Sequence, residues 1–311
     1  MKTLEITLIP LLLVCITVNV LNTTVASSYK TINVPNEYLT IQEAIEAASP
    51  GDTINVTKGN YHEHLTITKN NLKLIGEDSD TTIIDGDLAG TVVKVLANNV
   101  TITGFTVRKS GDQGEGFYLY RSNNSMIIGN TISDNSLGIM LAVYSTHNII
   151  SENMITRNTE GISIRAYADS NIVSKNNITN NWQRGIGLSQ TKDNAITGNN
   201  ITQQEVGINI FGTFSTRNNI SGNIIANNGE GIHMFQSSGN IFYHNNFISN
   251  IEQVYFDISL TSLWDNGAEG NYWSDYVGKD ADNDGIGDTP YIINEYNRDR
   301  YPHMNPIPTL I

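Results

Sequence analysis

NTISDNSLGIMLAVYSTHNIISEN, residues 130–153, begins with an asparagine, and its last residue is the asparagine that opens the next stretch of the same kind. Asn130, Asn153, Asn176, Asn199, Asn223 and Asn245 follow one another at spacings of 23, 23, 23, 24 and 22 residues. A fixed period of this length is the sequence signature of a repeat architecture. We therefore expect one small structural unit to recur along most of the chain.

Three series of apolar residues keep the same period. They are Ile132, Ile155, Ile178, Ile201, Ile225 and Phe247; Ile139, Ile162, Ile186, Ile208, Ile232 and Val254; and Ile127, Ile150, Val173, Ile196, Ile220 and Phe242. These segments are short and β-branched, and turns of Asn, Gly and Ser separate them, so they suit strands rather than helices. The sequence predicts an all-β, right-handed parallel β-helix of about ten coils with three short strands per coil.

The physics of such a fold accounts for both repeating features. Successive coils stack about 4.8 Å apart, so the isoleucines form internal columns and each backbone amide pairs with the next coil. Asparagine tolerates the left-handed turn conformation, and its amide can hydrogen-bond to the same amide one coil on. Leucine-rich repeats are the competing architecture, but they need a helix or an extended return segment, and no helical period is present.

The two ends of a stack of strands need covering. TIQEAIEAASPGD, residues 40–52, has a capping box from Thr40 to Glu43 and an apolar face, which predicts a short N-terminal capping helix. GNYWSDY, residues 270–276, supplies three aromatic side chains that could close the last coil. We expect the β-helix to occupy residues 29–262 and a C-terminal cap to occupy residues 263–311.

Residues 1–28 have the pattern of a secretory signal peptide. They open with Lys2, run apolar from Ile6 to Leu21 and close with small residues. Retention of this segment as an N-terminal membrane anchor is the alternative. The only cysteine, Cys15, lies inside it, so no disulfide is expected in the mature chain. The predicted location is secreted, either extracellular or at the cell surface.

The composition narrows the choice of partners. The 311-residue chain has a net charge of -13 and a pI of about 4.8, so the basic footprint of a nucleic-acid-binding protein is missing. Glycosylation is one interpretation of the N-x-S/T sequons. The other is that a chain rich in Asn, Ser and Thr forms such sequons by chance. The sequon asparagines are Asn22, Asn55, Asn99, Asn123, Asn177, Asn200 and Asn219.

KDADNDGIGDTPY, residues 279–291, concentrates four aspartates near the end of the chain. Asp280, Asp282, Asp284, Ile286 and Asp288 match ligand positions 1, 3, 5, 7 and 9 of a calcium loop, with the carbonyl oxygen of Ile286 at position 7. Position 12, where a helix-loop-helix site has glutamate, is Tyr291, so this loop is more similar to those of extracellular repeat modules. Calcium is the predicted cofactor, and an acidic surface turn without metal is the alternative.

The sequence resembles a known family over nearly all of the predicted mature chain. TIQEAIEAASPGDTINVTKGNYHEHLTI (residues 40–67), the repeats, and GNYWSDYVGKDADNDGIGDTPYIINEYNRDRYPHMNP (residues 270–306) are similar to NosD-like repeat proteins of the pectin-lyase superfold. Proteins of this kind are common among the secreted and surface proteins of archaea and some bacteria. The resemblance implies a β-helix, but its members include carbohydrate-binding modules, sugar hydrolases, surface proteins and a periplasmic accessory of copper-enzyme maturation.

Outward positions beside the second apolar series form two further columns. They are Tyr118, Met140, Ser163, Gly187, Asn209, His233 and Tyr255; and Tyr120, Ala142, Arg165, Ser189, Phe211, Phe235 and Asp257. Rings spaced along a rod can stack on sugars while Arg165 and Asn209 bind hydroxyl or carboxylate groups. We therefore predict substrate binding by Tyr118, Tyr120, Arg165, Asn209, Phe211, His233 and Phe235. Shielding of the strands by these aromatic residues is the alternative.

Signals for catalysis and for copper are weak in the sequence. Only Asp257 is acidic in the two outward columns, so neither is expected to hold the carboxylate pair that a glycosidase needs. Asp112 and Glu115 are the remaining acidic pair and the only catalytic candidates. Of the six histidines, only His62 and His64 share a strand face, and we interpret both as structural rather than as copper ligands.

These observations favour a secreted or cell-surface module that binds carbohydrate or another cell-surface polymer, or that has a structural role. Two alternatives stay open: a polysaccharide-degrading enzyme, and a periplasmic accessory protein for copper-enzyme maturation. Contact with a membrane is expected only through an uncleaved N-terminal segment.

Overall fold

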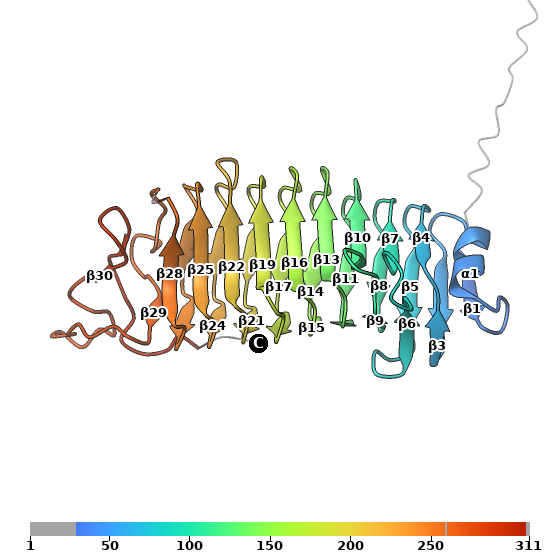
Figure 1. The fold of residues 1–311 in the computed structure, drawn as a ribbon, viewed down its shortest axis with the longest axis horizontal. Helices are drawn as coiled ribbons and strands as arrows, with labels where there is room; N and C mark the ends of the chain where they lie inside the picture. Colours follow the sequence, from blue (N-terminus) through green and yellow to red (C-terminus); the bar gives the residue numbers. More distant parts are fainter. Residues whose placement is uncertain (1–28, 259, 309–311) are drawn as a thin grey trace, which may run out of the picture.

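The computed structural model describes residues 29–258 and 260–308 and shows a rod of stacked coils (Figure 1). Three parallel sheets of ten, nine and ten strands run along the rod, and each coil adds one strand to each sheet. The predicted all-β parallel β-helix is confirmed. The predicted signal peptide, with Cys15 and Asn22, lies outside the described residues. No helix in the described ranges combines the length and the apolar character needed to span a bilayer.

The three sheets are called first, second and third here; along one coil, a strand of the first sheet is followed by a strand of the third sheet and then by a strand of the second sheet. The first sheet contains β1 Thr31–Val34, β2 Thr53–Val56, β5 Lys73–Gly76, β8 Thr101–Thr103, β11 Met126–Ile128, β14 Ile149–Ser151, β17 Ile172–Ser174, β20 Ala195–Thr197, β23 Asn219–Ser221 and β26 Ile241–Tyr243. The third sheet contains β3 Gly59–His62, β6 Thr82–Asp85, β9 Thr106–Arg108, β12 Thr131–Ser133, β15 Met154–Thr156, β18 Asn177–Thr179, β21 Asn200–Thr202, β24 Ile224–Ala226, β27 Asn246–Ile248 and β29 Tyr272–Trp273.

The second sheet has the longest strands, and Figure 1 shows them as a row of tall arrows along the rod. It contains β4 Leu65–Ile67, β7 Val93–Val95, β10 Glu115–Tyr120, β13 Leu137–Ala142, β16 Glu160–Arg165, β19 Arg184–Ser189, β22 Val206–Phe211, β25 Glu230–Phe235 and β28 Glu252–Phe256. Outside the three sheets lie the helix α1 Ile41–Ala47 and a two-stranded hairpin of β30 Tyr291–Ile292 and β31 Arg298–Asp299.

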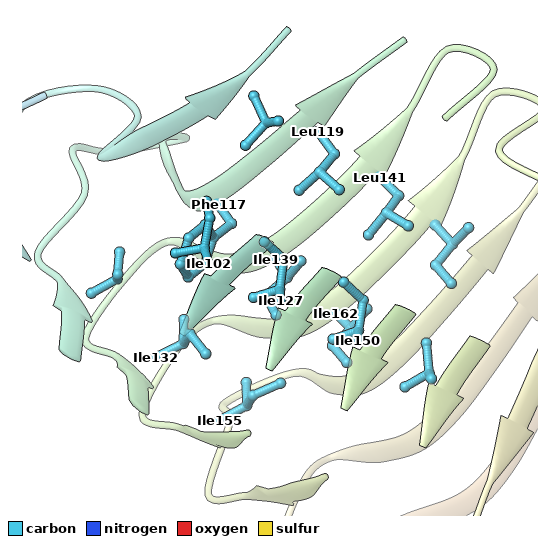
Figure 2. Close-up of a cluster of buried hydrophobic side chains, with 14 of the residues drawn as sticks. Ile102, Phe117, Leu119, Ile127, Ile132, Ile139, Leu141, Ile150, Ile155 and Ile162 are labelled. Atoms are coloured by element: carbon cyan, nitrogen blue, oxygen red, sulfur yellow. The ribbon is translucent and has the colours of Figure 1, made fainter. Parts of the chain in front are cut away.

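The three predicted apolar columns form the core. Register pairs join Ile132 to Ile155, Ile155 to Ile178 and Ile139 to Ile162, and these side chains are fully buried. Figure 2 shows members of the columns converging on the interior from all three sheets. Because each isoleucine packs between like neighbours, one local pattern builds the whole core.

The predicted asparagine column is a hydrogen-bonded ladder. Both the backbone N–H and Nδ2 of Asn130 donate to Oδ1 of Asn153, at 2.9 and 3.3 Å. Nδ2 also donates to the carbonyl oxygen of Ile102 in the preceding coil. The left-handed conformation, however, falls on the residue before each asparagine, as at Gly129 (φ 63°) and Glu152 (φ 58°). The asparagine therefore stabilises the turn through its amide and not by adopting positive φ.

Two further ladders line the other turns, and the sequence analysis missed both. In both, a member donates its backbone N–H to the side-chain oxygen of the next, and every donor except Asn181 and Gln204 also donates its side-chain amide to that oxygen. One ladder contains Asn135, Asn158, Asn181, Gln204, Asn228 and Asn250, and the other contains Asn148, Asn171, Asn194, Asn218 and Asn240. All three turns of a coil thus use the same device to satisfy buried backbone amides.

The glycine column in the second sheet has a steric cause. A Cβ atom built on Gly185 would lie 2.7 Å from the carbonyl oxygen of Gly207 and 2.8 Å from Cγ2 of Ile201. The neighbouring glycines of the column meet the next backbone at similar distances. Only glycine leaves room for the chain at this inward bend.

Both ends of the rod are covered. The predicted capping box between Thr40 and Glu43 is present at the start of α1, and Ile41, Ala44 and Ile45 of that helix are buried. Figure 1 shows α1 at the N-terminal end of the stack. At the other end β29 pairs with β27, although the predicted boundary at residue 262 would assign β29 to the cap.

Buried aromatic residues close the C-terminal end, as the sequence predicts for Trp273. The Trp273 ring stacks between Phe247, at a centroid distance of 4.2 Å, and Tyr291, at 4.3 Å. Trp264, which the sequence analysis did not select, stacks on Phe242 at 4.1 Å. These contacts remove the edge of the last coil from water.

The main asparagine ladder ends on a buried carboxylate. Asn271 donates its backbone N–H to Asp299 Oδ2 at 2.6 Å, and Trp273 Nε1 donates to the same oxygen at 2.9 Å. Asp299 is fully buried, and this burial raises its pKa to about 6, although hydrogen bonds from Trp273, Asn271 and Tyr301 act in the opposite direction. An ionised aspartate only accepts hydrogen bonds, so it suits the last position of the ladder.

We predict that Gly185→Ala destabilises the protein by about 1 to 3 kcal/mol, because the new methyl group overlaps the next coil. Gly187→Ala is the matched control in the same strand, since its Cβ would meet no atom closer than 3.9 Å. Thermal unfolding of the two variants decides the matter, and equal melting temperatures would contradict the steric explanation.

We predict that stability declines as the pH rises from about 4 to 6. The pKa of Asp299 is about 6 in the folded state against 3.8 when unperturbed, so the folded chain retains a proton that the unfolded chain releases. This contribution is complete below about pH 4, and as much as about 3 kcal/mol is lost as the pH passes through 6. Urea unfolding across this range measures it. Asp299→Asn should remove that part of the pH dependence; an unchanged slope in this variant would contradict the assignment.

Candidate functional site

The outward face of the second sheet carries the two predicted columns in the predicted register. Tyr118 pairs with Met140, and the column continues through Ser163, Gly187, Asn209, His233 and Tyr255. Tyr120 pairs with Ala142, followed by Arg165, Ser189, Phe211 and Phe235. Asp257 follows the end of β28. The positions of these side chains are therefore confirmed, while their role in binding stays a prediction.

Three adjoining depressions follow this face from β10 to β25, with volumes of about 330, 260 and 360 Å³. Glu160 and Arg165 line both of the first two, and Arg184 and Asn209 line both of the last two. The depressions thus form one groove along six coils of the rod. The structure brings the predicted residues Arg165, Asn209 and Phe211 together in its middle part.

The middle depression is a notch between two coils. Arg165 on β16 and Phe211 on β22 form its walls, and Gly187 and Ser189 of β19 form its floor, because these two residues have almost no side chain. Nε of Arg165 is buried and makes no hydrogen bond within the described part of the chain. We call this depression the Arg165 notch.

The other predicted binding residues make contacts outside the notch. Tyr118 and Tyr120 pack edge to face on β10, with ring centroids 5.8 Å apart. Phe235 stacks on one face of Phe211 at 4.9 Å. His233 has carboxylates at both ring nitrogens: Glu230 lies 2.7 Å from Nδ1, and Asp257 lies 2.8 Å from Nε2.

A third outward column, at the start of each long strand, holds several carboxylates, whereas the two predicted columns contain only Asp257, as expected. It runs Glu115, Leu137, Glu160, Arg184, Val206, Glu230 and Glu252. Glu230 and Glu252 are register partners on adjacent coils. The sequence analysis missed this column because two successive buried residues, such as Gly161 and Ile162, break the alternation along the strand.

The weak catalytic candidates Asp112 and Glu115 differ in their surroundings. Asp112 is exposed in the turn before β10. Glu115 is the first residue of β10, and its Oε2 accepts a hydrogen bond of 2.5 Å from Oγ1 of Thr91. A catalytic role for the pair stays an untested prediction.

The histidines expected to share a strand face have separate partners. His62 Nδ1 lies 2.7 Å from Asp87 Oδ1. Nδ1 of His64 lies 2.8 Å from the carbonyl oxygen of Thr91. Asp85 is close to His62 and Asp87, but it is held by ion pairs with Arg108 and Lys109.

A different pair of histidines comes together at the C-terminal end of the rod. His244 occupies the left-handed position (φ 55°) before the ladder residue Asn245. The backbone N–H of His303 donates to the carbonyl oxygen of Asn271, which places the returning cap segment beside this turn. With Glu269 they form a cluster in which one potential ligand atom of each residue lies within 4.8 Å of the others. We call it the His244–Glu269–His303 cluster.

The cluster contains a nitrogen without a partner. His244 Nε2 lies 2.5 Å from Glu269 Oε2, and the two imidazole centroids are 5.9 Å apart. Nε2 of His303 is buried and makes no hydrogen bond to any described residue. Burial lowers the pKa of His303, and nearby His244 lowers it further, while Glu269 raises it. The sequence analysis missed this site because the cap does not follow the repeat that indicates neighbouring residues.

The acidic loop has a compact form. Potential ligand atoms of Asp280, Asp282 and Asp284 lie within 4.8 Å of one another. Asp280 accepts backbone hydrogen bonds from Asp284 and Gly285, and Gly285 has a φ of 91°. Asp288 instead accepts the backbone N–H of Ala281. Ile286 bridges to His303, so the loop is attached to the segment that carries this histidine.

Comparison with known proteins assigns the chain to a family. The family described as periplasmic copper-binding protein (NosD) matches residues 17–171 and 142–278. The chain belongs to the NosD family. Two NosD proteins, each named probable ABC transporter binding protein NosD, come from Pseudomonas aeruginosa and Stutzerimonas stutzeri and are 42% and 40% identical over 90 residues. The matched part is 29% of this chain and 21% and 20% of theirs, so the chain aligns with about a fifth of their length.

Solved structures share the fold of this NosD family member at low sequence identity. The pectate lyase Pel9A has a TM-score of 0.59 and 13% identity, with 78% of this chain and 82% of that chain covered. XylC, solved in complex with xylose, has a TM-score of 0.60 and 12% identity, with 78% and 67% covered. At such identities the likeness concerns the β-helix fold alone.

Proposed function

We propose that this NosD family member is an exported accessory protein that binds copper at the His244–Glu269–His303 cluster. The observation that carries the proposal is the buried Nε2 of His303, which has no hydrogen-bond partner among the described residues and lies in a group with two other donor side chains. Imidazole and carboxylate groups suit Cu(II), which also forms the most stable complexes of the divalent first-row metals.

The surroundings of the cluster support exchange of the bound ion. His244 borders a depression of about 400 Å³ that Tyr243, Lys175 and Ile307 also line. An ion held there would remain open to a partner on one side. Because the family description is periplasmic, and relatives are named ABC transporter binding proteins, we propose a cell-envelope location and a membrane transporter as partner.

We predict that the metal-free protein binds one Cu(II) ion and that His303→Ala weakens this binding at least about tenfold, since a ligand is removed. His244→Asn should act in the same way, because asparagine keeps the left-handed turn but removes the imidazole. Isothermal titration measures the affinity, and electron paramagnetic resonance reports nitrogen ligands directly.

His147→Asn is the matched control for this experiment. His147 is exposed and occupies the equivalent left-handed position (φ 58°) before a ladder asparagine, but it is outside the cluster. The His147→Asn variant should bind copper with the same affinity as the unmodified protein. If His303→Ala and His147→Asn bind copper equally, the cluster is not the site.

Carbohydrate binding is the second candidate function, and the groove on the second sheet favours it. The groove is long, follows the rod, and contains an aromatic ring beside polar groups, as sites for extended sugars do.

We also propose calcium in the acidic loop. At a hundredfold excess of calcium over Kd, binding to the folded state alone should raise stability by about 2.7 kcal/mol, seen as a melting shift of a few degrees. Asp282→Ala should abolish the shift without disturbing the loop, since the Asp282 carboxylate accepts no hydrogen bond from the described residues. Calorimetry with calcium, magnesium or chelator tests this proposal. If the scans of the unmodified protein with calcium and with chelator superimpose, the loop is an acidic turn that binds no metal.

A further inference from the structure

We propose that the Arg165 notch binds a carboxylate-bearing sugar ring, that is, one uronate unit of a polysaccharide. This inference rests on the second candidate function, carbohydrate binding, and names the class of sugar. Three features of the notch carry it: its width, its unpaired cation and the free face of its aromatic wall.

The width follows from the register. Arg165, Ser189 and Phe211 occupy one column on successive coils. Two coil steps separate the walls by about 10 Å, and the serine between them leaves this space open. A Cβ on the neighbouring Gly187 would meet no atom within 3.9 Å, which shows that the floor is also open. The gap between the walls therefore suits one ring-sized group.

The cation of the notch has a buried donor atom without an acceptor among the described residues. Arg184 is ion-paired with Glu160, whereas Arg165 forms neither an ion pair nor a side-chain hydrogen bond with any described residue. The buried Nε of Arg165 is thus a donor that lacks its acceptor, a costly arrangement unless a ligand supplies one. Arg165, Arg184 and Glu160 are the charged residues of the notch, so the notch is positive by one charge, whereas Glu115, Glu205 and Glu230 line the adjoining depressions. A planar guanidinium binds a carboxylate better than a neutral hydroxyl group.

The aromatic wall supplies an apolar contact. Phe235 covers one face of Phe211, with ring planes 9° apart. The other face of Phe211 is directed along the column toward Ser189, and the side chain is 45% exposed. A sugar ring in the notch can place its C–H face on Phe211 while its carboxylate reaches Arg165. Neither wall alone would select this combination.

Trigalacturonate and its fully methyl-esterified form provide a matched pair of probes, because they differ in charge but keep the same sugar rings. Titration calorimetry of the full chain with chelator present excludes bridging by calcium. We expect the acid form to bind at least about tenfold more tightly than the ester, and the preference to decrease as salt is added.

Variants then locate the effect. Arg165→Gln should abolish the preference for the acid, and Ser189→Phe should fill the notch and abolish binding of both probes. Arg157→Gln is the control, because Arg157 is on the same rod but already paired with Asp134 outside the notch. Melting temperatures check that each variant folds.

Each outcome is decisive. Equal binding of acid and ester by the unmodified protein overturns the acidic class and leaves carbohydrate binding standing. If neither probe binds, both the acidic class of sugar and the carbohydrate-binding function are overturned. A preference for the acid that survives Arg165→Gln places the ligand elsewhere and refutes the notch as its site.

Discussion

The whole rod depends on the side-chain amide that satisfies the backbone of the neighbouring coil at each turn. Without it, the N–H groups of the turns would be buried and unpaired, at a cost of about 1 to 3 kcal/mol each. Asn130, Asn135 and Asn148 each begin or continue such a ladder at one of the three turns. Because every member donates in the same direction, a ladder needs a final acceptor, and the buried Asp299 serves the main one.

The same constraint decides where function can reside. Inward positions are fixed by the isoleucine columns, and the bend is fixed by glycine, so neither can vary without damage to the stack. Outward positions carry no such restriction. A small residue at Ser189 between large ones at Arg165 and Phe211 is enough to open a notch. Binding sites on this fold thus arise from the contrast between neighbours in a column.

The sequence predicted the parts of the molecule that obey the repeat. A spacing of about 23 residues places Ile155 above Ile132 and Phe211 above Ser189 without any knowledge of the coordinates. The prediction failed where the repeat or the alternation breaks. The Glu230–Glu252 pair was missed because two adjacent residues of each long strand point inward. The His244–Glu269–His303 cluster was missed because the cap returns along a path that no period describes.

The position of His244 explains how a metal site can arise at the end of such a rod. The residue before each ladder asparagine is held in the left-handed conformation by its neighbours and does not enter the core, so its side chain is free to vary: Glu152, Lys175 and Gly198 occupy it in other coils. In the interior of the stack a histidine there would face only the next turn. At the last coils it meets the cap, which brings Glu269 and His303 alongside. The end of the repeat is therefore the place where one permissive turn position can acquire two further ligands.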